Sequence, residues 1–160
     1  MPFSLRDDPM TLRAIIMDHH QNPRNKREVN DERYKTVHMD SSSCIDDIYV
    51  QLLMEDGVVK DVCWHGVSCA ISTASTSIMT TLIMGKKEDE ANYIMANFNK
   101  MINEEEFDEE CLGEAIAFIN TSKQASRIKC ATIGWRGLKE LFDEEGKEHV
   151  HDEDWFIRSR

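Results

Sequence analysis

The hydrophobic positions in the first part of the chain follow the period of an amphipathic helix. Within residues 9–20, apolar side chains recur every three to four positions from Leu12 onward, and the pattern stops before Pro23. Because proline disfavours helical backbone at the residue before it, we expect the helix to end there. His19 and His20 fall in the last turn, where histidines more commonly satisfy helix carbonyls and the helix dipole than bind a metal.

The next apolar runs have the composition of β-strands. Residues 34–39 are compatible with a short strand, and residues 48–54 and 58–64 are rich in β-branched and other apolar side chains. Asp56-Gly57 lies between the last two runs and is typical of a two-residue hairpin turn. The pattern therefore predicts a small antiparallel sheet.

Helical spacing returns after the hairpin. We expect the second hairpin strand to turn at Gly66 and enter a helix over residues 70–84, with Cys69 in its first turn and Gly85 at its end. The many serines and threonines of this helix indicate close packing against a neighbour. Further helices are predicted over residues 88–102, 111–119 and 127–145, with an acidic connector over residues 103–110.

Composition narrows the class of protein. A chain of 160 residues is long enough for one core, and we expect one domain over residues 1–147 and a polar tail over residues 148–160. The formal net charge of -11 disfavours nucleic acid as a partner. The first residues lack the apolar run of a signal peptide, and no stretch approaches the roughly 20 apolar residues that span a bilayer. We expect a cytoplasmic protein without membrane contact.

Three of the five cysteines lie at element boundaries, where a thiol is placed for chemistry. Cys44 follows the first strand run with Asp46 two residues later, Cys69 lies at a helix start, and Cys130 follows the basic Arg127. Unpaired N–H groups at a helix start favour the thiolate, which is the form that binds metals. Three thiolates and one carboxylate suit the tetrahedral coordination of Zn²⁺.

Spacing alone leaves a second interpretation open, because no CxxC pair is present and scattered cysteines are common in protein cores. Cys111 in particular is expected to be a small buried hydrophobe. Four anionic ligands around Zn²⁺ would leave an excess of two negative charges. The positive charges of the neighbouring Arg127 and Lys129 would offset this excess.

Four stretches of the chain, spread over roughly residues 10–143, form specific motifs. They are Asp18-His19-His20-Gln21-Asn22-Pro23-Arg24-Asn25, then Cys44-x-Asp46, then Gly66-x-x-Cys69-Ala70-Ile71-Ser72-x-Ala74-Ser75, and Arg127-Ile128-Lys129-Cys130-Ala131-Thr132 through Trp135. Together these stretches resemble the U-type iron–sulfur cluster assembly scaffolds. Within that family the chain resembles the SufU branch, because Lys129 stands where IscU proteins have histidine and the long interval from Cys69 to Cys130 suits the same branch.

This resemblance implies a fold, a metal and a partner. The fold is α+β, with a three-stranded antiparallel sheet packed against about five helices, and the metal is zinc. The implied role is to accept persulfide sulfur from a SufS-type pyridoxal-phosphate cysteine desulfurase, for use with other cluster assembly proteins. Cys44 is the implied acceptor, and Arg127 is implied in docking or activation. The implied zinc ligands are Cys44, Asp46, Cys69 and Cys130.

The same cysteines and their neighbours are compatible with other functions. The same four residues suit a scaffold that holds a transient iron–sulfur cluster, or a structural zinc adaptor. A Cys–His hydrolase with His65 or His19 as base has the least support, because no oxyanion hole is indicated. The chain also departs from the family, since Ile45 and Ser68 replace glycines near the ligands and Ala125 replaces a proline.

Overall fold

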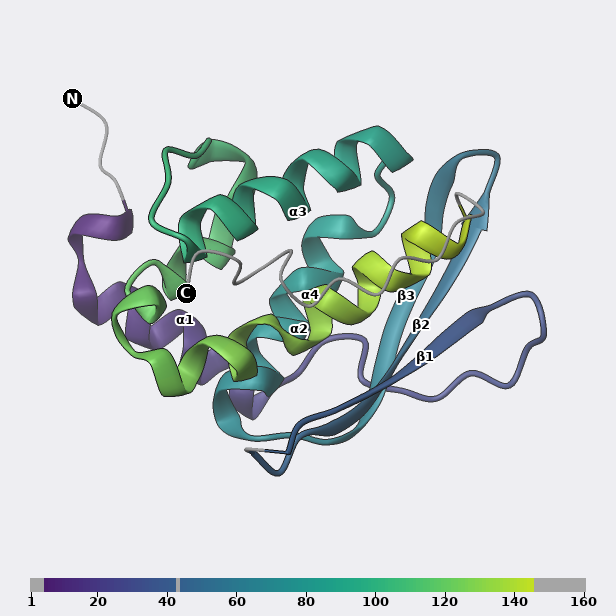
Figure 1. Cartoon of the computed structure of the whole chain (residues 1–160), viewed down its shortest axis with the longest axis horizontal. Coiled ribbons are helices and arrows are strands. Elements are labelled where there is room, and N and C mark those ends of the chain that lie inside the picture. The colour runs from purple at the N-terminus through teal and green to yellow at the C-terminus, as the bar shows by residue number, and fades with distance from the viewer. Residues whose placement is uncertain (1–4, 43, 146–160) are drawn as a thin grey trace.

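A three-stranded antiparallel sheet lies beside a group of helices, one of which, α4, crosses it (Figure 1). The structure is a computed structural model and describes residues 5–42 and 44–145, so the predicted tail over residues 148–160 lies outside the described residues. The strand order is β1-β2-β3, with β1 at Lys35–Asp40, β2 at Asp47–Glu55 and β3 at Val58–Val67. The predicted α+β class and antiparallel sheet are confirmed.

The four α-helices of the described residues begin and end close to the predicted positions. The expected helix over residues 111–119 differs, because η2 is a 3₁₀ segment with a break at Gly113, whose φ is 49°. No helix in the described part of the chain is both long and apolar enough to cross a membrane. The helices are α1 (Pro9–Gln21), α2 (Ala70–Ile83), α3 (Glu88–Ile102) and α4 (Ala125–Glu145), with 3₁₀ segments η1 (Leu5–Asp7), η2 (Glu110–Phe118) and η3 (Thr121–Lys123).

The β2–β3 hairpin turns where the sequence predicts it. Asp56 and Gly57 both have positive φ, at 55° and 77°, which is the conformation that a two-residue hairpin turn requires. At the other end of the hairpin, the predicted turn at Gly66 is wrong, because β3 continues to Val67. Gly66 pairs with Ile48, and a Cβ at Gly66 would lie 2.9 Å from the Cα of Ile48. Glycine at this position therefore allows close strand approach.

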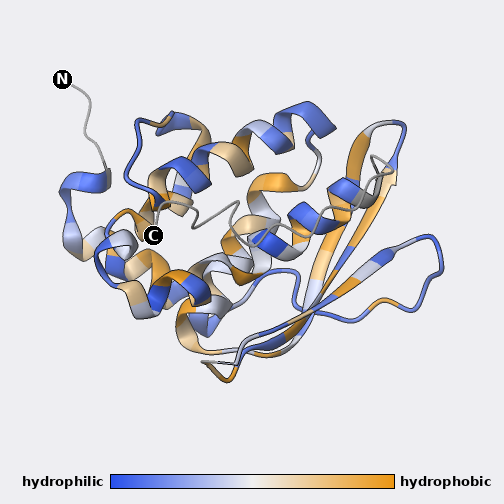
Figure 2. Cartoon of the chain, viewed as in Figure 1, coloured by the Kyte–Doolittle hydropathy of each residue, from blue (hydrophilic) through white to orange (hydrophobic). Residues whose placement is uncertain are grey.

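The core lies between the sheet and the helices. Figure 2 shows hydrophobic residues along β2 and β3, and the largest buried side chains include Trp64, Trp135 and Phe98. The rings of Phe98 and Trp135 stack with their centroids 4.0 Å apart. Gly137 of α4 leaves room for Met39, Val50 and Val37 of the sheet. The sheet and α4 are thereby packed closely together.

Small residues bring α2 and α4 into direct contact. The Ser75 hydroxyl donates to the Ala131 carbonyl at 2.6 Å and accepts from the Trp135 indole N–H at 3.0 Å. Gly134 lies directly against Thr76, whose hydroxyl is buried without a partner among the described residues. The interpretation of the serines and threonines as close-packing residues is confirmed for Ser75 and Thr76.

We expect Gly134→Ala to destabilise the protein by about 1–3 kcal/mol, because the new methyl group would overlap the Thr76 hydroxyl and push α2 from α4. The measurement is urea unfolding of both variants. Thr76→Ala in the same chain should recover most of the loss, since it removes the overlapping atoms. Equal losses in the single and double variants would contradict this close packing.

Candidate metal centre

The four residues predicted as metal ligands converge in the structure. One ligand atom from each of Cys44, Asp46, Cys69 and Cys130 lies within 4.8 Å of the others. Cys44 and Asp46 come from the β1–β2 loop, Cys69 precedes α2, and Cys130 lies in the second turn of α4. These positions are far apart in sequence, so the fold and not local spacing assembles the group.

Strand pairing and helix packing bring the four predicted ligands together. Asp47 is the first residue of β2 and pairs with Val67, the last residue of β3. Asp46 and Cys69 therefore lie just beyond the same end of the β2–β3 pair. The Ser41 N–H donates to the Asp46 carbonyl at 3.1 Å and closes the loop that carries Cys44. Cys69 is the N-cap of α2 and not a first-turn residue. The contact between α2 and α4 then places Cys130 beside Cys44.

Among the described residues, hydrogen-bond partners are found for one of the two Asp46 carboxylate oxygens. Its side chain is 2% exposed, and its Oδ1 accepts from the Cys69 N–H at 2.9 Å and from the Ser72 hydroxyl at 2.7 Å. Its Oδ2 is buried and has no hydrogen-bond partner among the described residues. Because an unpaired buried carboxylate oxygen is costly, this atom marks a place for a cation.

The three thiols lie close enough together to affect one another's pKa values. The Sγ atoms of Cys130 and Cys44 are 3.4 Å apart. Burial, together with the hydrogen bond to Cys44 and the charge of Cys69, raises the pKa of the Cys130 thiol well above its usual range. A divalent cation would reverse this effect by favouring the thiolates. Three sulfurs and one carboxylate oxygen are a donor set that zinc accepts in tetrahedral geometry.

Positive side chains flank the Cys130 end of the site. Arg127 and Lys129 are both exposed, and Arg127 lies three residues before Cys130, on the same side of α4. Neither forms an ion pair with another residue in the described part of the chain. Both charges therefore remain available to a partner.

The remaining cysteines lie outside the group, as expected. Cys63 is buried, its Sγ lies 3.6 Å from the Gln51 side-chain oxygen, and burial raises the pKa of its thiol to about 11. The Cys111 thiol donates to the Asp108 carbonyl at 3.2 Å, and burial also raises its pKa to about 11. Neither thiol is set up as a nucleophile or ligand.

The two histidines proposed as a hydrolase base have other roles. His19 is 1% exposed, its Nδ1 lies 2.7 Å from the Ser77 hydroxyl, and its Nε2 lies 2.8 Å from Glu114. It therefore joins α1, α2 and η2 through side-chain partners, and not through the helix carbonyls that its position in the last turn of α1 predicts. The His65 ring stacks on Tyr49 at 5.0 Å. Among the described residues, neither ring contacts a thiol, so the hydrolase hypothesis lacks a base.

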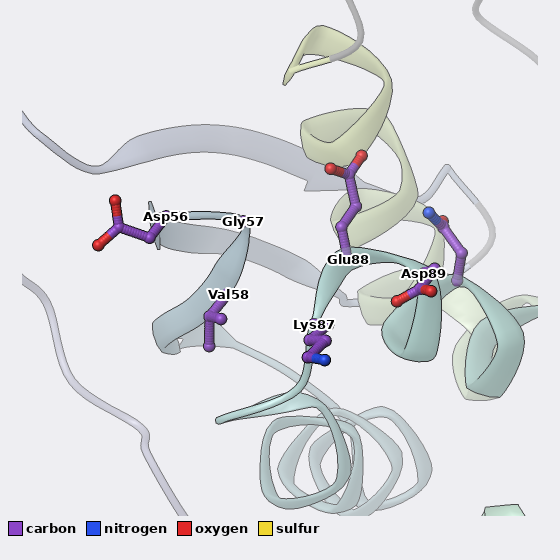
Figure 3. Close-up of a pocket in the computed structure, with 7 residues that line it drawn as sticks. Asp56, Gly57, Val58, Lys87, Glu88 and Asp89 are labelled. Carbon is purple, nitrogen blue, oxygen red and sulfur yellow. The ribbon is translucent and has the colours of Figure 1, made fainter.

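A pocket elsewhere on the surface does not resemble a binding centre. It lies between the β2–β3 turn and the start of α3, at the opposite end of the hairpin from the cysteines. Figure 3 shows the carboxylates of Asp56 and Glu88 pointing to different sides rather than toward a common point. The four-residue group thus remains the candidate site.

Sequence reasoning missed Ser72. This fully buried residue lies three positions after Cys69, and its hydroxyl contacts Asp46. The sequence contains a signal for this contact, since the third residue after a helix N-cap lies beside the N-cap residue. Ile45, which replaces a family glycine, is exposed and has no positive φ, so its backbone here does not need a glycine.

Comparison with known proteins agrees with this geometry. Residues 12–131 match the model of the NifU-like N-terminal domain. The chain belongs to this family. A NifU-like relative, the zinc-dependent sulfurtransferase SufU of Bacillus subtilis, is 39% identical over 148 residues, which cover 91% of this chain and 99% of the relative.

Other NifU-like relatives are scaffold proteins. The iron–sulfur cluster assembly scaffold protein IscU of Streptococcus pyogenes serotype M1 is 30% identical, with 88% of each chain covered. The crystal structure of FiSufU from Fervidobacterium islandicum AW-1 has a TM-score of 0.71 and 32% identity, and covers 78% of this chain and 91% of that one. The predicted resemblance is confirmed, and this NifU-like chain is a member of an iron–sulfur cluster assembly scaffold family.

Proposed function

We propose that this NifU-like protein is a zinc-dependent sulfur acceptor that receives persulfide sulfur from a cysteine desulfurase. The observation that carries the proposal is the convergence of three thiols around a buried carboxylate, one oxygen of which has no partner in the part of the chain that the structure describes. The similarity to a relative named as a zinc-dependent sulfurtransferase supports the same function. We place the protein in the cytoplasm, where it would pass sulfur to other cluster assembly proteins.

The same residues serve both metal binding and transfer in this proposal. Cys44, Asp46, Cys69 and Cys130 would hold the zinc. Bound zinc would keep the thiols deprotonated and tie the β1–β2 loop to α2 and α4. Metal binding would therefore also add to the stability of the fold.

Cys44 is the proposed acceptor because it is the one of the three thiols that lies in a loop, between β1 and β2. Its neighbour Ile45 is 64% exposed, whereas Cys130 is buried in α4 and Cys69 is held as the N-cap of α2. The Cys44 thiolate attacks the outer sulfur of the desulfurase persulfide. The S–S bond of that persulfide breaks, the desulfurase cysteine leaves as a thiolate, and Cys44 becomes the persulfide.

The partner is proposed to be a SufS-type pyridoxal-phosphate cysteine desulfurase. Exposed Ile45 and Val67 lie beside the thiols, and Arg127 adds a positive charge on a chain whose net charge is -11. A desulfurase surface with an apolar centre and acidic groups would complement this region. Arg24, another positive residue, is already paired with Asp18 at 2.7 Å.

The function is tested by incubating the zinc-loaded protein with a cysteine desulfurase and cysteine. Intact mass spectrometry should show one additional sulfur on the chain, and thiol reduction should remove it. Metal analysis of the purified protein should find zinc. A coloured iron–sulfur species without sulfur transfer would instead support the scaffold alternative.

Charge reversal at Arg127 tests the docking region. We expect Arg127→Glu to lower stimulation of the desulfurase by about tenfold or more at low salt, because close interfacial charges contribute strongly to association. The zinc content should not change, since the Arg127 side chain is exposed. Lys100→Glu, which changes an exposed residue of α3, is the control. Unchanged stimulation by Arg127→Glu would remove Arg127 from the interface.

A further inference from the structure

Ser72 is buried between two of the proposed zinc ligands. It is 0% exposed, and its hydroxyl lies 2.7 Å from Asp46 Oδ1 and 3.4 Å from Cys69 Sγ. A serine hydroxyl has one hydrogen to donate. The nearest acceptor is Asp46 Oδ1, since the Cys69 carbonyl is farther away at 3.2 Å. The hydroxyl hydrogen is therefore assigned to the carboxylate.

Two donors hold the Asp46 carboxylate in one orientation. The Cys69 N–H and the Ser72 hydroxyl both donate to Oδ1, while Oδ2 has no partner among the described residues. Rotation of the carboxylate would break both hydrogen bonds in a site where Asp46 is buried. This arrangement leaves Oδ2 as the oxygen available to a cation.

We infer that Ser72 is a positioning residue that orients Asp46 for the metal and thereby sets the affinity of the site for zinc. This inference rests on the proposed zinc-binding function. Residues that hydrogen-bond to a metal ligand fix its orientation, and their loss typically costs 10–100-fold in metal affinity. Ser72→Ala leaves Asp46 Oδ1 with the Cys69 N–H alone, so the carboxylate must be ordered when the metal binds.

A purely structural role for the hydroxyl makes a different prediction. In that case Ser72→Ala would lower the stability of the metal-free protein without changing the affinity for zinc. Ser77 provides the matched control, because it is a fully buried serine of the same helix. Among the described residues, the Ser77 hydroxyl contacts His19 and the Arg24 N–H and none of the four proposed ligands.

The experiment compares the full-length wild type with Ser72→Ala, Ser72→Thr and Ser77→Ala. Zinc is titrated into each metal-free protein in competition with a chromophoric chelator, and the melting temperature of each metal-free protein is measured. We expect the zinc Kd to rise by about 10–100-fold in Ser72→Ala. It should stay within about threefold of wild type in Ser72→Thr, which keeps the hydroxyl, and in Ser77→Ala, which keeps the Asp46 contact.

Absorption spectra of the Co²⁺-loaded proteins give a second readout. The sulfur-to-cobalt charge-transfer bands should keep their intensity in Ser72→Ala, since three thiolates remain, while the ligand-field bands should shift with the altered Asp46 contact. A wild-type zinc Kd in Ser72→Ala would overturn the inference. So would an equal loss of affinity in Ser77→Ala, or unfolding of metal-free Ser72→Ala while Ser77→Ala stays folded. Absence of zinc binding by the wild type would overturn the proposed function itself.

Discussion

Cys69→Ala is expected to lower the bound zinc from one equivalent per chain to nearly none. Cys69 is the proposed ligand that lies between the end of β3 and the start of α2, and its N–H also donates to Asp46 at 2.9 Å. Removal of its thiol leaves two sulfurs and a carboxylate, which is too few donors for a closed structural zinc site. The bound zinc is measured by metal analysis of protein purified without chelator, and the stability is measured by thermal melts of the same protein.

The same substitution should lower the melting temperature to that of the metal-free wild type or slightly below. Binding energy of a structural zinc adds to folding stability, and loss of a helix N-cap costs about 1 kcal/mol more. Cys63→Ser and Cys111→Ser are the controls, because neither thiol belongs to the group, and both should retain zinc. Full zinc occupancy in Cys69→Ala would reject the ligand assignment.

Cys44→Ser is expected to abolish acceptance of sulfur from a cysteine desulfurase. A serine hydroxyl is not ionised at neutral pH and cannot attack the outer sulfur of a persulfide. After incubation with desulfurase and cysteine, peptide mass spectrometry of the wild type should find the extra sulfur on Cys44. The fold of the variant should be checked by circular dichroism, since Cys44 is also a proposed zinc ligand.

Asp46→Ala separates loss of the acceptor from loss of a metal ligand. This variant keeps all three thiols and lacks only the carboxylate, so it should still accept sulfur on Cys44 while zinc binds more weakly. Sulfur found on Cys130, with Cys44→Ser still accepting it, would identify Cys130 as the acceptor. That result would overturn Cys44 as the acceptor.

Local patterns in the sequence determine most of the elements. The Asp56-Gly57 turn was predictable because few residues adopt positive φ without strain, and both positions require it. The helix α3 begins at Glu88 and ends at Ile102, as its spacing of apolar residues predicts. These features depend on backbone preferences and side-chain periods within a short window, so the sequence is sufficient to find them.

The family and the four proposed ligands also came from the sequence, through motifs rather than spacing. The scattered positions of Cys44, Cys69 and Cys130 alone do not distinguish ligands from core residues. The sequence motifs around those positions favour ligands over core residues. The family model that matches residues 12–131 confirms the family.

Only the tertiary structure decided how the site is built. The extension of β3 through Gly66 depends on pairing with Ile48, and the approach of Cys130 to Cys44 depends on the packing of α4. The free Oδ2 of Asp46 and the buried contact with Ser72 likewise depend on which residues meet across the fold. Contacts between residues so far apart in sequence are set by strand register and helix packing, which no local pattern contains.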